Sequence, residues 1–105
     1  MEKVKVKIYP KVFQSGKAQD LFIKVDCEQK VESQVVVKIQ PMENYGVLHS
    51  SISRIHDEER YPYILAERVK KGVYKVNYNF FDEQRYDVKV KIGEEMVFNG
   101  HVYSV

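Results

Sequence analysis

The sequence predicts an all-β protein, a sandwich of antiparallel strands, from three observations. Apolar residues recur at every second position in segment after segment, which places one set of side chains on a buried face and the other in water. These apolar residues are mostly β-branched or aromatic, as strands prefer. No long stretch shows the period of about 3.6 residues that marks an amphipathic helix. We therefore expect seven or eight short strands and no substantial helix.

Length and composition limit the other classes. A chain of 105 residues has the size of one domain, so we expect residues 1–105 to form a single sandwich. The net charge of +2 gives no bulk attraction for polyanions. The single cysteine excludes an internal disulfide and a four-cysteine zinc site. No apolar run approaches the roughly 20 residues of a membrane-spanning helix, so we expect no membrane segment.

Five segments carry the alternation most clearly, and in each of them the apolar set is expected to face the core. The segments are residues 4–8, 21–25, 35–39, 74–80 and 86–92. Their expected core residues are Val4, Val6 and Ile8, then Leu21, Ile23 and Val25, then Val35, Val37 and Ile39, then Tyr74, Val76, Tyr78 and Phe80, and finally Tyr86, Val88, Val90 and Ile92.

Turn residues separate these segments. Lys70-Lys71-Gly72 predicts a tight turn before the strand that starts at residue 73, and Gly93-Glu94-Glu95 predicts a short hairpin loop. Asn99-Gly100 predicts a second turn or a bulge in the last strand, since both residues tolerate positive φ.

The segment 40–63 is irregular and is bracketed by Pro41 and Pro62. Proline is poorly tolerated inside central strands, so an edge strand over 47–55 is the most that we expect there. Residues 63–69 form a better strand candidate, although either face of this strand could point inward.

Residues 72–105 follow the pattern G-x-Y-x-V-x-Y, a turn, Y-x-V-x-V and a hairpin. This stretch resembles the C-terminal half of immunoglobulin-like sandwich domains, in particular the filamin-type and bacterial accessory forms. The spacing from Asp82 to Tyr86 is similar to that of the tyrosine corner in such domains. The resemblance implies that the Tyr86 hydroxyl bonds a nearby backbone group. Val88 stands where antibody-like domains have a cysteine, which implies a cysteine-free relative.

We expect a non-catalytic role, as an accessory or interaction module of a larger, bacterial protein. Sandwich domains of the kind that this stretch resembles serve as adhesion modules, spacers and accessory domains of enzymes, so the resemblance itself does not select one function. We expect this module to pack against or orient a neighbouring domain or a protein partner. The residues expected to do so are Tyr45, Arg60, Tyr61 and Tyr63, since tyrosine and arginine often anchor protein interfaces.

The same tyrosines permit a different function, because planar rings also stack on sugars. A carbohydrate-binding module is therefore the alternative prediction. A purely structural role also stays open, in which Tyr61 and Tyr63 cover one open end of the core.

No pattern of catalytic or metal-binding residues stands out. His49, His56 and His101 lack the spacing of a metal site, and Cys27 lies between acidic residues that would blunt its reactivity. The acidic pairs fall in predicted turns, where solvated charges are expected. We predict no enzyme activity, no metal and no cofactor.

Lysines alternate along the first strand as Lys3, Lys5 and Lys7, and again as Lys89 and Lys91. In the resembling fold the two sets could lie near each other and form one basic patch. Lysine on an edge strand guards against edge-to-edge aggregation, and few aromatic residues are expected beside these lysines for stacking on bases. We therefore predict no nucleic-acid binding.

Overall fold

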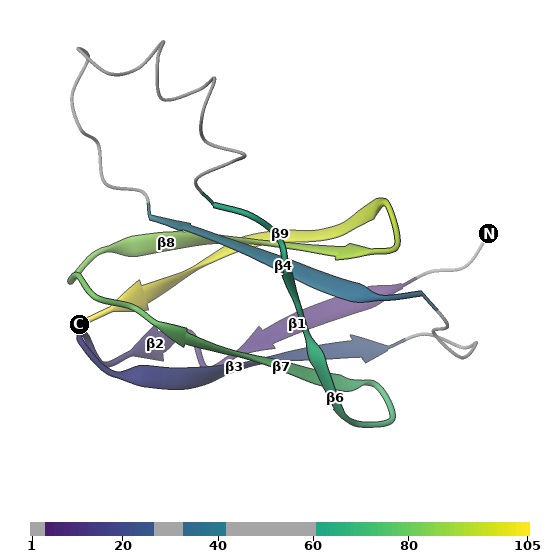
Figure 1. Ribbon diagram of the computed structural model, residues 1–105, viewed down its shortest axis with the longest axis horizontal. Coiled ribbons are helices and arrows are strands. Elements are labelled where there is room, and N and C mark those ends of the chain that lie inside the picture. Colours follow the sequence, from purple (N-terminus) through teal and green to yellow (C-terminus); the bar gives the residue numbers. More distant parts are fainter. Residues whose placement is uncertain (1–3, 27–32, 42–60) are drawn as a thin grey trace, which may run out of the picture.

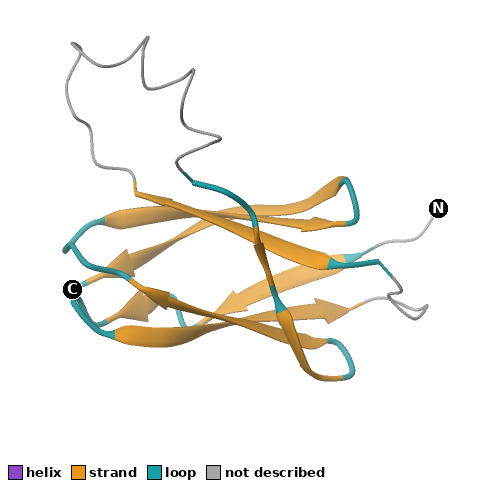
Figure 2. Ribbon diagram, viewed as in Figure 1, coloured by secondary structure: helices purple, strands orange, loops and turns teal. Residues whose placement is uncertain are grey.

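The computed structural model describes residues 4–26, 33–41 and 61–105, which fold into two sheets that face each other (Figure 1). The described residues consist of strands joined by turns, without a helix (Figure 2). They contain nine strands: β1 (Lys5–Tyr9), β2 (Val12–Phe13), β3 (Ala18–Asp26), β4 (Val35–Pro41), β5 (Ile64–Leu65), β6 (Glu67–Lys70), β7 (Val73–Asn79), β8 (Arg85–Ile92) and β9 (Glu95–Ser104).

The first sheet has the order β1-β3-β7-β6 and the second the order β2-β9-β8-β4-β5. All pairs are antiparallel except β2 with β9, which run parallel. The all-β prediction is confirmed, and the two sheets are consistent with a sandwich. The predicted edge strand over 47–55 lies outside the described residues.

The described residues contain more strands than the expected seven or eight, because two segments of the chain each contribute one strand to each sheet. After β1 the chain passes Pro10, which has no N–H to donate to a ladder, and β2 joins the second sheet. The predicted strand over 63–69 divides at Ala66, whose N–H donates to the Val35 carbonyl at 2.9 Å. Its first part, β5, pairs with β4, and its second part, β6, pairs with β7.

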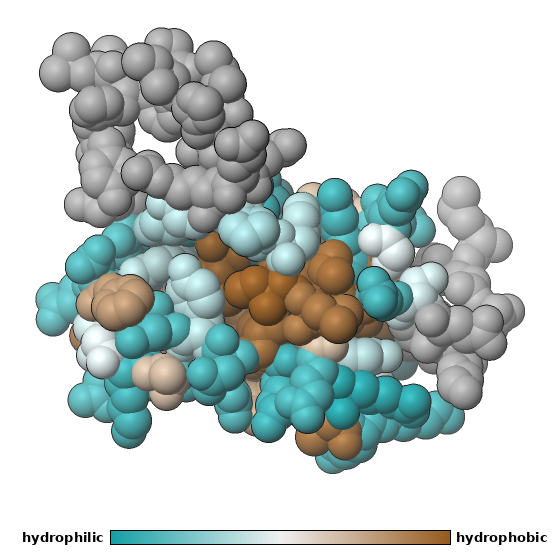
Figure 3. Space-filling model, in the orientation of Figure 1, coloured by the Kyte–Doolittle hydropathy of each residue, from teal (hydrophilic) through white to brown (hydrophobic). Residues whose placement is uncertain are grey.

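The core lies between the sheets and contains every apolar side chain that the alternation placed there, either buried or packed against its rim. In Figure 3 hydrophobic residues gather in the middle of the molecule, and hydrophilic residues follow the outer sides of both sheets. Phe80 is fully buried; its ring stacks on Phe13 at 4.3 Å and meets Tyr78 and Tyr86 edge-on at 4.9 and 5.0 Å.

The corner that leads into β8 is held by Tyr86. Its hydroxyl accepts a hydrogen bond from the Asp82 N–H at 3.1 Å and donates to the Asp82 carbonyl at 3.5 Å. The expected bond from the Tyr86 hydroxyl to a nearby backbone group is therefore confirmed. Two residues further on, Val88 is fully buried.

Replacing Tyr86 with phenylalanine is expected to lower the free energy of unfolding by about 1 kcal/mol, because both hydrogen bonds are lost while the ring still packs. Urea-induced unfolding measures the change. Tyr103→Phe is the matched control, since the Tyr103 ring is 45% exposed. Equal losses from the two variants would contradict the role of the Tyr86 hydroxyl.

Two of the predicted turns are confirmed. Gly72 has φ +77° in the tight turn between β6 and β7, and Gly93 has φ +62° in the hairpin between β8 and β9. The turn predicted at Asn99-Gly100 is wrong, because β9 continues through both residues without positive φ. Gly100 instead makes room for an aromatic ring, since a Cβ there would lie 2.7 Å from Cζ of Phe98. The irregularity of β9 lies nearer the hairpin, where Val90 opposes Phe98 but Lys91 opposes Met96.

Candidate interaction surface

The outer face of the second sheet carries three neighbouring lysines, and we call it the lysine face. Alternation along β4, β8 and β9 turns the residues between the buried ones outward. The strand register aligns these residues in four rows across the sheet: Leu65, Val36, Lys91 and Met96; Lys38, Lys89 and Asn99; Gln40, Asp87 and His101; Arg85, Tyr103 and Val12.

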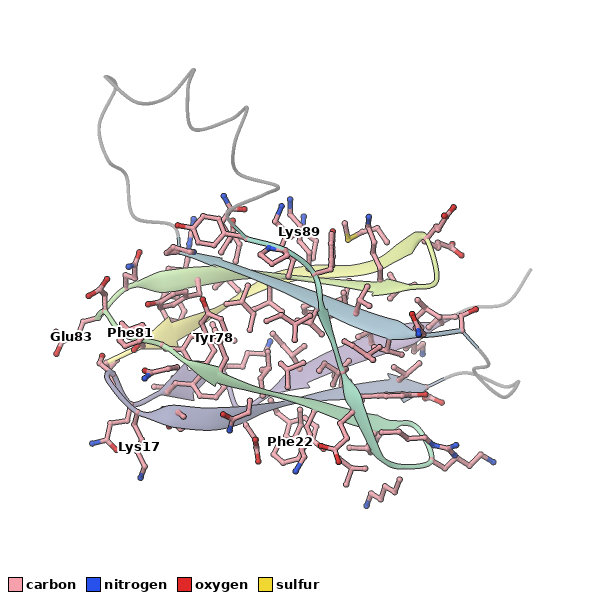
Figure 4. The ribbon with its side chains drawn as sticks, in the orientation of Figure 1. Lys17, Phe22, Tyr78, Phe81, Glu83 and Lys89 are labelled. Atoms are coloured by element: carbon pink, nitrogen blue, oxygen red, sulfur yellow. The ribbon has the colours of Figure 1, made fainter. Side chains whose placement is uncertain are left out.

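Three lysines meet near one end of this face. Lys38 and Lys89 oppose each other directly on β4 and β8, and Lys91 follows Lys89 on the same side of β8. Lys38 is 7% exposed, and Lys89 and Lys91 are half-buried. Among the residues that the structure describes, none of the three forms an ion pair with a carboxylate. Figure 4 shows Lys89 pointing away from the first sheet.

Tyr63 covers the lysines from the β5 side. The Nζ atom of Lys91 lies 4.4 Å from the centroid of the Tyr63 ring, and Nζ of Lys38 lies 5.9 Å from it. Such cation–π contacts attract the ammonium groups to the ring. Tyr63 therefore holds two cations of the same sheet in place.

Apolar side chains are exposed on the same face, two of them in the row of Lys91 and two in the row of Arg85. Val12, Leu65, Met96 and Tyr103 are 55%, 60%, 44% and 45% exposed. Exposed apolar residues are ordinary when scattered singly, but these four share one side of one sheet. The lysine face thus combines three neighbouring cations with exposed apolar groups.

The outer face of the first sheet is different, because the charges at its centre are paired. Nζ of Lys75 lies 4.0 Å from carboxylate oxygens of both Asp20 and Glu67. Asn77 donates a hydrogen bond to Asp20 at 3.0 Å. These partners neutralise the centre of that face.

Like charges also meet on the first sheet, where Lys7 opposes Lys24. Both side chains are exposed there, and water and salt screen the repulsion between them. The burial of Lys38 distinguishes the lysine face from this pair, since repulsion grows as water is removed.

The structure places the predicted partner-binding tyrosines in different surroundings. Tyr63 lies on the lysine face. Tyr61 is one of the groups that raise the pKa of Tyr78, and Figure 4 shows Tyr78 between the two sheets. Tyr45 and Arg60 lie outside the described residues.

The single basic patch suggested for the lysines of the first strand and of β8 is wrong. Lys5 and Lys7 lie on β1, at an edge of the first sheet, whereas Lys89 and Lys91 lie on β8, inside the second sheet. Lys3 lies outside the described residues. In the second sheet, the lysine opposite Lys89 is Lys38, which the sequence does not single out. The only sequence signal for Lys38 is its polar position in an alternating strand.

The hydroxyl of Tyr78 lies in surroundings that disfavour its ionisation. Burial raises the pKa of Tyr78 above 10.0, and the neighbouring Tyr86 and Tyr61 raise it further. The unfolded chain therefore ionises Tyr78 at lower pH than the folded chain does. The stabilising contribution is complete below about pH 10 and is lost as the pH rises through the folded pKa.

We expect the free energy of unfolding to fall above about pH 10 and the Tyr78→Phe variant to lose part of this fall. Urea titrations at several pH values on either side of the tyrosine pKa measure both. The same pH dependence in the variant and the parent chain would contradict the assignment.

Within the described residues, no three histidine, cysteine or acidic side chains form a group that could hold a metal. The described part of the chain also contains no helix that could cross a membrane. No protein-family model matches the sequence, and no curated protein matches it.

Proposed function

We propose that the chain is a non-catalytic interaction module with an immunoglobulin-like fold, which packs against a neighbouring domain or a protein partner. The strand orders support this fold. The order β1-β3-β7-β6 corresponds to the A-B-E-D sheet of such domains, and β9-β8-β4 corresponds to their G-F-C order. The Tyr86 corner and the buried Val88 two residues later fit the same scheme.

The lysine face is the surface that we propose for the partner. The exposure of Leu65 and Met96 in the row of Lys91, with Tyr103 further along the same face, is the observation that carries the proposal. Methionine, tyrosine and arginine are enriched in protein interfaces, and the face offers Arg85 beside Tyr103. A partner that covered this face would bury apolar area that now meets water.

Site-specific cross-linking in the cells of origin tests the proposal. A photoreactive residue at position 89 is expected to capture a protein, whereas one at position 17 is not. Figure 4 places Lys17 and Lys89 on opposite sides of the molecule. The captured protein is then purified and its affinity is measured for the parent chain, for Tyr63→Ser and for the control Phe81→Ser.

We expect Tyr63→Ser to weaken the complex about tenfold, as for a moderate interface contact, and Phe81→Ser to leave it unchanged. Capture from position 17 in place of position 89, or no capture from either, would contradict the proposal. So would an affinity that is indifferent to Tyr63.

Carbohydrate binding remains a second proposal, but other aromatic residues now favour it. The Tyr63 ring is occupied by lysine ammonium groups. On the outer face of the first sheet, Tyr9 stacks on Phe22 at 5.3 Å, and Tyr9 is 42% exposed. Lys75, which opposes Phe22 in the sheet, offers a hydrogen-bond donor for sugar hydroxyls. Glycan-array binding that Tyr9→Ala abolishes would support this function, and an array without binding would exclude it for the sugars tested.

A further inference from the structure

We infer that the lysine face binds an acidic protein partner, whose carboxylates contact Lys38, Lys89 and Lys91. This inference rests on the proposed function, since it states the chemistry of the partner for the same surface. It is carried by the charges of the three lysines, whereas the proposed function is carried by the exposed apolar residues of the same face.

The first step is the repulsion within the face. Lys38 and Lys89 are direct cross-strand neighbours, and like charges placed in this way destabilise a sheet. Lys38 is also nearly buried, so water screens its charge poorly. No carboxylate among the described residues pairs with either lysine. A carboxylate from a partner would convert this repulsion into attraction.

The second step is the spacing of the ammonium groups. Lys89 and Lys91 are alternate residues of β8, so their backbones lie roughly 7 Å apart along the strand. Alternate residues of any extended segment have the same separation. Lys38 lies one strand away, roughly 5 Å to the side. Two acidic side chains at alternate positions of a partner segment can therefore each meet an ammonium group, and the one between Lys38 and Lys89 can meet two. Asp87, the next residue on this face of β8, limits the run to two.

Tyr63 acts as a positioning residue in this arrangement. Its ring contacts the ammonium group of Lys91 at 4.4 Å and lies 5.9 Å from that of Lys38. Held on the ring, two long side chains lose less rotamer freedom when the partner binds. The partner thus meets cations that are already placed.

The surroundings of the lysines favour a protein over a nucleic acid or a sulfated glycan. Leu65, Val36 and Met96 form one row with Lys91. A phosphate or sulfate backbone would not bury these apolar side chains. Single-stranded nucleic acid needs free aromatic rings beside the cations for stacking, but the Tyr63 ring already contacts Lys91, and Tyr103 lies two rows away from Lys89. The net charge of +2 also provides little long-range attraction for a polyanion.

The inference is tested by nuclear magnetic resonance titrations of the full chain with defined probes. One probe is a short peptide of alternating glutamate and leucine, and its matched control is the same peptide with serine in place of leucine. A heparin-derived oligosaccharide and a single-stranded oligonucleotide represent the other two classes. Lys89→Glu, Lys89→Arg and Lys17→Glu are titrated beside the parent chain.

We expect the glutamate–leucine peptide to shift the amide signals of β4, β8 and β9. Its affinity should fall about tenfold in Lys89→Glu, as for other close charge pairs at interfaces, and stay nearly unchanged in Lys89→Arg and Lys17→Glu. The serine peptide should bind about tenfold more weakly, because it lacks the apolar contribution. Tyr63→Phe should preserve binding, and Tyr63→Ser should weaken it.

Tighter binding of the oligosaccharide or the oligonucleotide than of the glutamate–leucine peptide would overturn the inference. Equal effects of Lys89→Glu and Lys17→Glu would also overturn it. If the peptide fails while a photoreactive residue at position 89 still captures a protein, the acidic chemistry is wrong and the proposed function stands. If neither the peptide binds nor position 89 captures a protein, the lysine face is not the partner-binding surface.

Discussion

Replacing Phe80 with alanine is expected to lower the free energy of unfolding by about 3–5 kcal/mol. The side chain is fully buried, and its ring contacts Phe13, Tyr78 and Tyr86. Removing it opens a cavity where both sheets contribute aromatic rings, and these rings can fill the space only in part. Domains of this size have a free energy of unfolding of about 5–15 kcal/mol, so this single change removes a large part of it. Urea-induced unfolding at neutral pH measures the loss.

The next residue along the chain provides the control. Phe81 has the same side chain but is 70% exposed, and Figure 4 shows it at the turn that follows β7. Phe81→Ala should change the stability by no more than about 0.5 kcal/mol, as is usual for surface positions. A similar loss in both variants would contradict the inward assignment of Phe80 on which the described core depends.

Replacing Gly72 with alanine is expected to cost about 2–4 kcal/mol, because two effects combine. Gly72 has φ +77°, a conformation that alanine adopts only with strain. A Cβ at this position would also lie 2.9 Å from the backbone carbonyl oxygen of Val25. The Val25 N–H in turn donates to the Gly72 carbonyl at 2.7 Å, so neither backbone can move away freely.

Gly16 separates the two effects, since it has nearly the same φ, +76°, but a Cβ added there would have no neighbouring atom within 4 Å. Gly16→Ala should therefore show only the conformational strain, about 1 kcal/mol. Thermal and urea unfolding of both variants give the difference. If Gly72→Ala costs no more than Gly16→Ala, then the close approach of β3 to this turn is not present in solution.

Much of the fold follows from local patterns in the sequence. The alternation of Val88 and Val90 with lysines predicts which side chains are buried, because period two needs no knowledge of the neighbouring strand. The role of Tyr86 could also be predicted, since its hydroxyl bonds a residue only four positions away in the sequence. Local spacing is enough for contacts of this kind.

Contacts between distant segments could not be predicted in the same way. The division of residues 63–69 between two sheets depends on Ala66 meeting Val35, and neither residue signals this in the sequence. Gly100 suggests a turn because glycine permits positive φ, but it is needed for the space that the Phe98 ring occupies. Tertiary packing decides both cases.

The candidate site could be predicted only in part. Tyr63 is an expected partner-binding residue and does lie on the lysine face, whereas Tyr61, two positions earlier, is one of the groups that raise the pKa of Tyr78. Lys38 and Lys89 are 51 positions apart in the sequence, and only the pairing of β4 with β8 brings them together. A charge cluster formed across strands has no signature in a single sequence.

The proposed acidic partner requires that Lys38, Lys89 and Lys91 repel one another in the free chain. The most direct test is the free energy of unfolding of Lys89→Glu, measured by urea titration at low and high salt beside Lys17→Glu. We expect Lys89→Glu to be more stable than the parent chain by about 0.3–1 kcal/mol at low salt, because a cross-strand repulsion becomes an attraction. Salt should reduce this gain, and Lys17→Glu should change little. A Lys89→Glu variant that is less stable than the parent chain, with Lys17→Glu unchanged, would contradict this repulsion.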